Sequence, residues 1–483
     1  GDGAFTGGMV YEGMNNVSNL NNLIVVLNDN KMSISKNVGQ MANYLTKLRT
    51  DPKYFRVKAH METALGCIPA VGTALVEVLQ EGKKIIRRGI YHSTMFEEMG
   101  FQYVGPVDGH DVTELTRIFT NLQEQYSPVF LHIVTQKGKG LKPAEENPGE
   151  FHSVSAFDLD HLTNPEMSPK DSFSNRFGNK LAALGREVPN LCAITAAMKY
   201  GTGLNFFYHA IPERFFDVGM AEEHAVTFAA GLASQGMLPV VAIYSTFFQR
   251  AYDQMIHDVC LGSLPVIFTV DRSGIVGNDG ETHQGIFDLT FLSSVPNMSV
   301  MAPKNRWELE KMLQFAISYD GPIAIRYPRG EAYRGLKEFL APVEYGVSEM
   351  LYEERGTALL AVGSMVSTAE HIREKLKSAG QPCTLVNGRF VKPMDTDVID
   401  HLAGTHHTIV TLEENVLRGG YGERVTDYVQ KHYPQIKVVN IALPDAYVEH
   451  GNVSVLRNEL GIDSDSILAQ LKREGVLETD AEA

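Results

Sequence analysis

The sequence has few cysteines, fewer basic than acidic residues, and no long apolar run. Its four cysteines lie far apart with no CxxC pair, a pattern that fits a reduced, cytoplasmic protein and supports neither a disulfide framework nor a zinc site. Lysine and arginine number 43 against 58 aspartates and glutamates, and the net charge of −15 argues against nucleic-acid or anionic-membrane partners. The apolar segments are too short for a membrane helix. An ordinary soluble globular protein is therefore expected.

A starting methionine is also missing, and the chain opens on the motif GDGAFTGG. We therefore expect the first residue to lie within a domain whose amino-terminal part is missing. At about 100–200 residues per domain, the length of 483 residues predicts about three domains.

Short β-branched apolar runs alternate with amphipathic stretches along the chain. This alternation predicts parallel sheets covered by helices on both faces, with ligand-binding residues at the carboxyl ends of the strands. The expected strands are residues 23–27, 129–134, 240–244, 266–270, 323–326, 358–362, 384–386, 408–412 and 438–441.

Two polar breaks, at residues 142–170 and 335–345, divide this pattern. The predicted fold class is α/β, with three parallel-sheet αβα domains of which the first is incomplete. The predicted domains are residues 1–160, 161–340 and 341–483. Residues 36–88 are less regular, and no element is assigned to them.

The opening GDG motif and the segment VVLNDNKM together suggest a magnesium site. Mg²⁺ prefers oxygen ligands, which the carboxylate of Asp2, the amide oxygen of Asn30 and the backbone carbonyl of Met32 could supply. The alternative is that GDG forms only a turn and NDN only a polar loop.

The strings GDGAFTGGMVYEGMNN and VVLNDNKMSIS resemble the 1-deoxy-D-xylulose 5-phosphate synthases, a transketolase-type family that uses thiamine diphosphate. The resemblance extends to near Leu460. It implies that Asp2, Asn30 and Met32 bind Mg²⁺ and that Gly3 and Ala4 help to bind the cofactor.

The resemblance also assigns the residues around the cofactor's pyrimidine ring. In DVGMAEEHAVTFAAG, Glu222 matches the glutamate that activates the cofactor, and Glu223 stands where the family usually has glutamine. Phe247 is expected to face the pyrimidine. The alternatives are a helix-terminal carboxylate for Glu222 and an ordinary core position for Phe247.

An acceptor phosphate requires cationic groups, and three segments at strand ends provide them. The resemblance implies that Arg272 and Arg326 hold the phosphate and that Tyr244 and Arg250 lie near it. Asp279 is expected to hydrogen-bond a sugar hydroxyl. A single arginine after a strand is otherwise more often a surface ion pair.

Two histidines complete the expected site. His283, in the polar loop DGETHQG, is a candidate proton shuttle, and His152 matches a histidine on a mobile family segment. Leu141 stands where family members more often have tyrosine, which leaves the contacts of that segment open. The carboxyl-terminal block is expected to contribute packing and dimer contacts rather than chemistry.

The resemblance implies condensation of pyruvate with D-glyceraldehyde 3-phosphate, with loss of CO₂, by a cytoplasmic homodimer that requires thiamine diphosphate and Mg²⁺. The alternatives are a transketolase, a pyruvate dehydrogenase-type enzyme, or an inactive truncated fragment. Family members carry upstream segments that contribute to the site, so we expect these 483 residues alone to bind the cofactor poorly.

Overall fold

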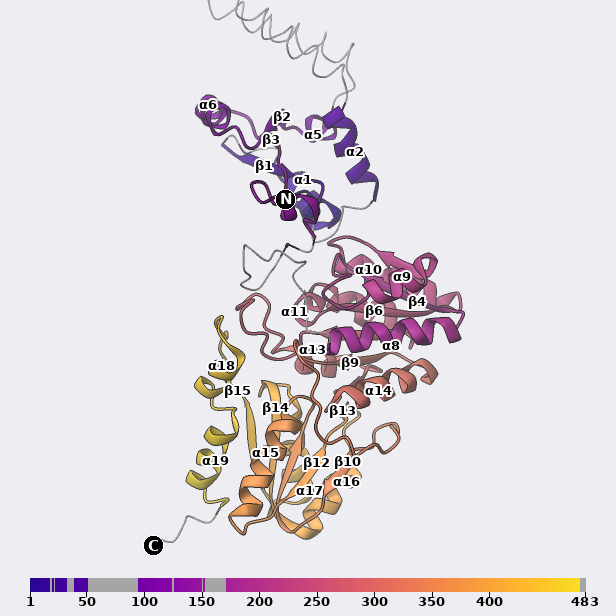
Figure 1. The fold of residues 1–483 in the computed structure, drawn as a ribbon, viewed down its shortest axis with the longest axis vertical. Coiled ribbons are helices and arrows are strands. Elements are labelled where there is room, and N and C mark those ends of the chain that lie inside the picture. The colour runs from indigo at the N-terminus through magenta and orange to yellow at the C-terminus, as the bar shows by residue number, and fades with distance from the viewer. Residues whose placement is uncertain are drawn as a thin grey trace, which may run out of the picture. The chain divides into compact units, whose positions relative to one another are not determined.

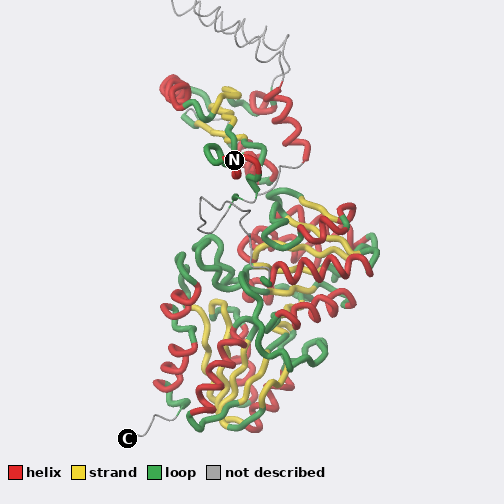
Figure 2. Tube along the Cα trace, viewed as in Figure 1, coloured by secondary structure: helices red, strands yellow, loops and turns green. Residues whose placement is uncertain are grey.

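The computed structural model describes residues 1–17, 20, 22–32, 39–50, 94–123, 126–149, 151–152 and 171–477. The chain forms two compact units. The amino-terminal unit comprises Gly1–Pro165 with Gly219–Ala221, and the carboxyl-terminal unit comprises Glu166–Val218 with Glu222–Ala483. Both combine helices with strands, coloured red and yellow in Figure 2.

The amino-terminal unit contains a parallel sheet with the strand order β1-β3-β2. Its strands are β1 (Ile24–Asp29), β2 (Gln102–Asp108) and β3 (Val129–Val134). Its described helices are η1 (Asp2–Thr6), α1 (Met9–Asn15), α2 (Gly39–Thr50), α5 (Met95–Glu98), α6 (Val112–Leu122) and α7 (Lys142–Glu146).

Aromatic side chains form the core of this unit. The ring of Phe96 stacks on Phe130 of β3 with centroids 3.8 Å apart, and Phe5 of η1 meets both rings edge-on. A capping box between Thr94 and Glu97 fixes the start of α5, the helix that carries Phe96. The core thereby anchors η1, which begins at Asp2, beside the sheet.

The carboxyl-terminal unit contains a seven-stranded sheet with the order β13-β8-β9-β7-β6-β4-β5 (Figure 1). Only β13 pairs antiparallel, with β8. Its strands are β4 (Leu191–Thr195), β5 (Phe215–Asp217), β6 (Leu238–Tyr244), β7 (Ile267–Asp271), β8 (Ser299–Met301), β9 (Ile323–Arg326) and β13 (Phe390–Lys392).

The helices of this part follow the strands in sequence. They are α8 (Phe173–Glu187), α9 (Asn205–Ala210), η3 (Pro212–Arg214), α10 (Glu222–Ser234), α11 (Ser245–Phe248), η4 (Gln249–Ala251), α12 (Tyr252–Gln254), the π-helix η5 (Met255–Cys260), α13 (Asp288–Ser294) and α14 (Arg306–Ser318). Because β6 is buried along its whole length, it reads as a continuous apolar run.

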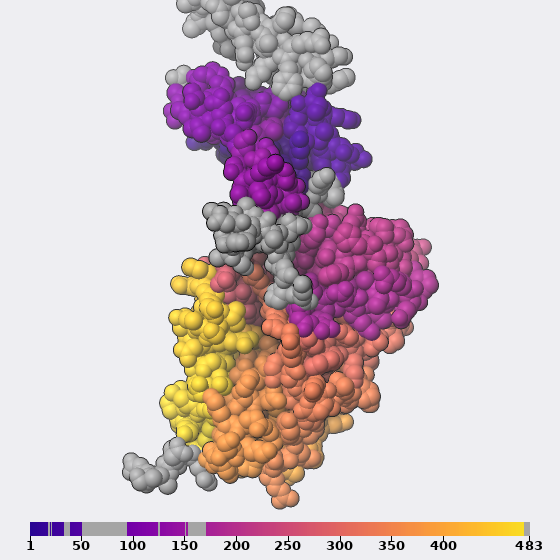
Figure 3. Space-filling view, in the orientation of Figure 1, coloured from indigo at the N-terminus to yellow at the C-terminus, as the bar shows by residue number. Residues whose placement is uncertain are grey.

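A second sheet of the same unit has the order β10-β12-β11-β14-β15, with only β10 antiparallel. Its strands are β10 (Glu349–Tyr352), β11 (Gly356–Ala361), β12 (Thr384–Asn387), β14 (His406–Val416) and β15 (Lys437–Leu443). Its helices are α15 (Met365–Ser378), α16 (Thr396–Thr405), α17 (Tyr421–His432), α18 (Val453–Glu459) and α19 (Ser464–Arg473). The two sheet regions share one continuous surface in Figure 3, and one core cluster joins them.

The sheet order positions the candidate acceptor residues. Strands β9, β7 and β6 are neighbours, and Tyr244, the last residue of β6, pairs with Asp271, the last of β7. Because parallel strands end at the same edge, the segments after these three strands meet there.

The α/β expectation is confirmed, and each of the nine expected strands overlaps an observed one. Strands β2, β4, β5, β8, β10 and β13 were not expected. Most of residues 36–88 lie outside the described residues.

Candidate functional site

Asp2 and the turn after β1 meet in the amino-terminal unit. The Asp2 carboxylate, 3% exposed, accepts hydrogen bonds from the backbone N–H groups of Gly3 at 3.1 Å and Lys31 at 2.7 Å. Within the turn, the Asn30 amide oxygen accepts from the N–H of Met32 at 3.0 Å. The structure thus brings Asp2, Asn30 and Met32 together, and Gly3 lies beside them; Ala4 follows in η1.

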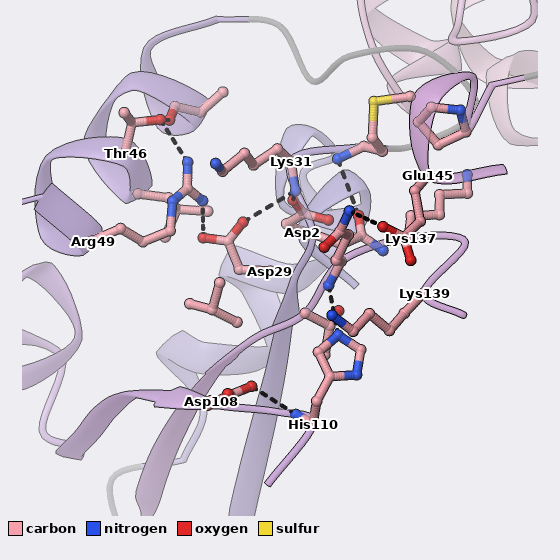
Figure 4. A pocket seen from close by; sticks show the side chains of 18 of the residues that line it. Asp2, Asp29, Lys31, Thr46, Arg49, Asp108, His110, Lys137, Lys139 and Glu145 are labelled. Atoms are coloured by element: carbon pink, nitrogen blue, oxygen red, sulfur yellow. Dashed lines mark hydrogen bonds and ion pairs between the residues drawn. The ribbon is translucent and has the colours of Figure 1, made fainter. Parts of the chain in front are cut away.

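Asp2, Asn30 and Met32 line a cavity of about 780 Å³, shown in Figure 4. Its basic side chains are Lys31, Arg49, Lys137 and Lys139. The remaining lining residues are Asp29, Ala42, Asn43, Leu45, Thr46, Asp108, His110, Val134, Thr135, Gln136, Glu145 and Pro148. Acidic and amide oxygens therefore face a cavity that also carries cationic groups, the combination that a divalent cation with a polyphosphate requires.

Asp29, the last residue of β1, lines the same cavity. Its carboxylate is fully buried, pairs with Arg49, and lies 3.0 Å from Nε2 of His132. Nδ1 of His132 lies in turn 2.7 Å from the hydroxyl of Tyr103. A neutral imidazole satisfies both contacts when Nε2–H donates to Asp29 and the Tyr103 hydroxyl donates to Nδ1.

The two aspartates differ in their electrostatics. Burial and the neighbouring carboxylate of Asp29 together raise the pKa of Asp2 to about 6, although backbone hydrogen bonds to Asp2 oppose this shift. Burial also opposes ionisation of Asp29, but its hydrogen bond with His132 and the charge of Arg49 lower its pKa to about 2. The uncompensated negative charge therefore lies on Asp2, where a cation would relieve it. The donor set fits Mg²⁺.

Glu222 begins α10 in the carboxyl-terminal unit and is 3% exposed. Its carboxylate pairs with Arg250 at 2.7 Å, and the same guanidinium reaches Glu223 at 3.2 Å. Burial raises the pKa of Glu222, although Arg250 opposes this effect. Arg250, which is expected near the acceptor phosphate, thus pairs with Glu222, the expected activating glutamate.

The expected aromatic and acceptor residues lie close together. The ring of Phe247 stacks on Tyr244 at 5.9 Å and meets His283 edge-on at 5.3 Å. The guanidinium of Arg272 lies 3.7 Å from the centre of the Tyr244 ring and donates to the carbonyl of Gly201. Phe247, Tyr244, Arg272 and His283 therefore form one group at the sheet edge.

Asp279 joins this group through an arginine that the sequence analysis did not select. Its carboxylate pairs with Arg329 at 2.6 Å. Burial lowers the pKa of His283, Asp279 opposes this shift, and Arg272 and Arg329 add to it. His283 is thus held neutral at pH 7 between charges of both signs.

Arg326 is not part of this group. Its guanidinium is 3% exposed, pairs with Asp288 at 3.0 Å, and donates to the carbonyl of Glu414 at 3.2 Å. The second arginine of RYPRG, Arg329, lies beyond the end of β9 with a side chain 36% exposed. The sequence contained a signal for Arg329. A residue that follows the strand can reach the edge where ligands bind, whereas Arg326 ends the strand in the core.

His152 lies in the amino-terminal unit. Its Nδ1 is 2.9 Å from the ammonium of Lys137, which lines the cavity. Burial lowers the pKa of His152, and the charge of Lys137 adds to this effect. Leu141 precedes α7 as its N-cap residue.

The chain was compared with known families and proteins. Its residues 1–135 match the family model "1-deoxy-D-xylulose-5-phosphate synthase". A 1-deoxy-D-xylulose-5-phosphate synthase from Lachnoclostridium phytofermentans is 49% identical over 98% of this chain and 76% of its own length. The chain belongs to the 1-deoxy-D-xylulose-5-phosphate synthase family. Another family member, from Desulforudis audaxviator, is 47% identical over 98% of this chain and 75% of its own length.

Other models and solved structures agree with this membership. Residues 171–334 match "Transketolase, pyrimidine binding domain" and residues 346–467 match "Transketolase, C-terminal domain". A split-gene transketolase, described as an inactive β4 tetramer, has a TM-score of 0.57 at 26% identity, covering 62% of this chain and 97% of its own. A Campylobacter jejuni transketolase (TM-score 0.55, 16% identity, 97% and 76% coverage) shares the fold. The transketolase-type fold is confirmed.

None of the described helices is long and apolar enough to cross a membrane. The described ranges also hold no cluster of three or more His, Cys, Asp and Glu side chains suited to a metal.

Proposed function

We propose that the chain catalyses the condensation of pyruvate with D-glyceraldehyde 3-phosphate, with loss of CO₂, to give 1-deoxy-D-xylulose 5-phosphate. The observation that supports this most is the meeting of Asp2, Asn30 and Met32 at a cavity lined by basic side chains, in a member of this family. The proposal includes a cytoplasmic homodimer and domains at residues 1–160, 161–340 and 341–483. Three family models, matching residues 1–135, 171–334 and 346–467, support this division.

Asp2, Asn30 and the carbonyl of Met32 would hold Mg²⁺, and the basic cavity would hold the diphosphate of thiamine diphosphate. Once bound, this cofactor would supply carbanion chemistry, which the loss of CO₂ from pyruvate requires. Gly3 and Ala4 would pass close to the diphosphate because they are small. Lys137 adds positive charge to the cavity, and its contact with His152 places that histidine near the same groups.

Glu222 would hold a proton toward the cofactor's pyrimidine ring. Burial favours the protonated carboxyl, which can donate a hydrogen bond to a ring nitrogen. Arg250 now pairs with Glu222, but it can keep Glu223 as a partner when Glu222 turns to the cofactor. Phe247 would cover one face of the ring.

The acceptor aldehyde would be bound by the group at the sheet edge. Arg272 and Arg329 provide two cations for its phosphate, and Arg329 replaces Arg326 in this role because Arg326 is occupied by Asp288. Tyr244 orients Arg272, and Asp279 is suited to a sugar hydroxyl. His283, held neutral, can accept or donate a proton at the aldehyde oxygen.

The activity is tested by incubating the purified protein with pyruvate, D-glyceraldehyde 3-phosphate, thiamine diphosphate and Mg²⁺, and detecting the product by mass spectrometry. Removing Mg²⁺ with a chelator should abolish product formation, and adding Mg²⁺ back should restore it. Transfer of a two-carbon unit from a ketose phosphate, without pyruvate, would indicate a transketolase instead.

The variants Glu222→Gln and Glu223→Gln form a matched pair at adjacent positions. Glu222→Gln should lower turnover by about 10²–10⁴-fold, the usual contribution of a positioned acid or base. Glu223→Gln removes only the more exposed partner of Arg250 and should stay near the parent rate. Equal losses in both variants would contradict the role of Glu222.

A further inference from the structure

The loop of residues 272–285, which follows β7, carries Arg272, Asp279 and His283. Its two ends are joined by backbone hydrogen bonds between Gly274 and Gly285, at 2.6 and 2.8 Å. These bonds close the base of the loop. The segment between them is held by the hydroxyl of Thr246, which donates to the carbonyl of Thr282 at 3.1 Å, and by the ion pair of Arg329 with Asp279. Contacts with residues 346–467, the segment matched by the C-terminal domain model, hold it as well.

Gln284 makes the central contact. Its side chain is buried, its Oε1 accepts from the N–H of Val276 at 2.7 Å, and its Nε2 donates to the carbonyl of Glu449 at 3.0 Å. The carbonyl of Val448 lies 3.4 Å from the same nitrogen. A backbone N–H can only donate and a carbonyl can only accept, so the amide fits in one orientation. Gln284 therefore ties the two sides of the loop to Val448 and Glu449.

Two glycines bring the loop against the same segment, near the start of α18 (Figure 1). A Cβ on Gly277 would lie 2.8 Å from the carbonyl oxygen of Gly451, and one on Gly280 would lie 3.3 Å from Cβ of His450. Gly277 also has a φ of +81°, which disfavours any other residue. The loop thus lies against residues 450 and 451 with no room for a side chain at Gly277.

The base of the loop rests on Glu414. A Cβ on Gly274 would lie 2.5 Å from the Glu414 carboxylate. That carboxylate is held by two hydrogen bonds from Arg457, at 3.0 and 3.1 Å, and by one from Ser364 at 2.7 Å. A charged, fully bonded side chain therefore supports the point where the loop begins.

We infer that Gln284 is a positioning residue through which the carboxyl-terminal domain, residues 346–467, holds the loop of residues 272–285. The inference rests on the proposed function for its effect on catalysis. It assigns to this domain a part in acceptor binding, in addition to packing. Gln284 acts on Arg272, Asp279 and His283 through the loop and not on the substrate.

The variant Gln284→Glu tests this directly, because it keeps the size and shape of the side chain. Its carboxylate can still accept from Val276, but it has no N–H and would face the carbonyl oxygens of Val448 and Glu449. We expect the KM for D-glyceraldehyde 3-phosphate to rise on the order of 10- to 100-fold, the effect of a small misplacement of binding groups. Decarboxylation of pyruvate without the aldehyde should be unchanged.

Amide hydrogen exchange provides a readout that does not depend on activity. Exchange in residues 274–283 should be faster in Gln284→Glu than in the parent, while β7 (Ile267–Asp271) should be unchanged. Gln430→Glu, the same substitution at an exposed position of α17, should alter neither the KM nor the exchange. Should Gln284→Glu fail to fold, Gly277→Ala perturbs the same contact from the loop side and should give the same two effects.

The inference is wrong if the loop exchanges as in the parent, whatever the KM does, since Gln284 would then not hold it. It is also wrong if exchange accelerates and the KM stays the same, because the contact would then be irrelevant to the acceptor. A parent protein without condensation activity would contradict the proposed function, and the exchange comparison would still decide whether the domain holds the loop.

Discussion

At the scale of single residues, Arg326 and Arg329 lie three positions apart in the sequence but have different surroundings. Arg326 ends β9 inside the core, where Asp288 and the Glu414 carbonyl occupy its guanidinium. Arg329 follows the strand and meets Asp279 at the ligand edge with a partly exposed side chain. The first arginine is placed to stabilise the fold, and the second is placed to meet an anion.

We therefore predict opposite consequences for the two alanine variants. Arg329→Ala should raise the KM for D-glyceraldehyde 3-phosphate by about 10–100-fold, as expected for loss of about 1.5–3 kcal/mol of charged hydrogen bonding. Its use of unphosphorylated glyceraldehyde should change little. Arg326→Ala should lower the free energy of unfolding by about 3–5 kcal/mol, because it leaves the buried carboxylate of Asp288 without its cation, with only the Ser245 hydroxyl donating to it among the side-chain contacts described.

Kinetics with both aldehydes and thermal unfolding of both variants check this prediction. Each variant serves as the control for the other. A phosphate-specific defect in a stable Arg326→Ala protein would show that the guanidinium leaves Asp288 during catalysis and would contradict our assignment.

At the scale of elements, nine strands were predictable because they read largely as apolar runs, as in β6 and β11. Strand β4 was missed although it is equally apolar and buried. The short strands β5, β8 and β13 have three residues each, too few to show a pattern. Strand β2 contains glycine and proline, which are uncommon inside strands and interrupt its apolar pattern. Sheet order and the antiparallel β10 and β13 depend on long-range pairing, which local sequence does not carry.

The same limit applies to the candidate metal site. Asp2 and Asn30 were predicted from their motif, but the support of Asp29 by His132 and Tyr103 was not. Each of these three side chains comes from a different strand, β1, β3 and β2. Their proximity exists only once the order β1-β3-β2 is formed.

We predict that the hydrogen-bonded side chains of Asp29, His132 and Tyr103 position the metal ligands. Tyr103→Phe leaves Nδ1 of His132 without its 2.7 Å partner and should lower the free energy of unfolding by about 1–3 kcal/mol. It should also weaken Mg²⁺-dependent binding of thiamine diphosphate by about 10–100-fold, as is usual for residues behind metal ligands. Calorimetric titration with and without Mg²⁺ measures the binding, and chemical denaturation measures the stability.

Tyr126→Phe is the matched control, because this tyrosine is 88% exposed and should change neither quantity. If Tyr103→Phe lost stability but bound thiamine diphosphate with unchanged Mg²⁺ dependence, the contacts among Asp29, His132 and Tyr103 would be purely structural.

At the scale of the carboxyl-terminal unit, buried charges join the two sheet regions. Lys304, just before α14, lies 3.1 Å from Glu308 in the first turn of that helix. It also lies 2.6 Å from Glu349 of β10. Arg389 pairs with the same two carboxylates at 2.6 and 2.8 Å. Two positive and two negative groups thus balance in the interior.

The ionisation of Glu308 depends on this balance. Burial opposes its charge, but Lys304 and Arg389 more than compensate, and the pKa of Glu308 is lowered. A carboxyl with a lower pKa in the folded than in the unfolded chain contributes stability above its ordinary value of about 4.5 and loses it as the pH falls toward the lowered value. The network should therefore weaken on acidification.

Lys304→Met tests how strongly these charges hold the two sheet regions together. The variant leaves two buried carboxylates with Arg389 as their one remaining cation in the network described here, so it should lower the free energy of unfolding by about 3–5 kcal/mol at pH 7. The deficit should shrink below about pH 4.5, where protonation removes the excess negative charge. Lys377→Met, at an exposed position of α15, should match the parent at every pH. Denaturant unfolding followed across this pH range measures both effects, and a Lys304→Met protein as stable as the parent at pH 7 would mean that apolar packing alone joins the two regions.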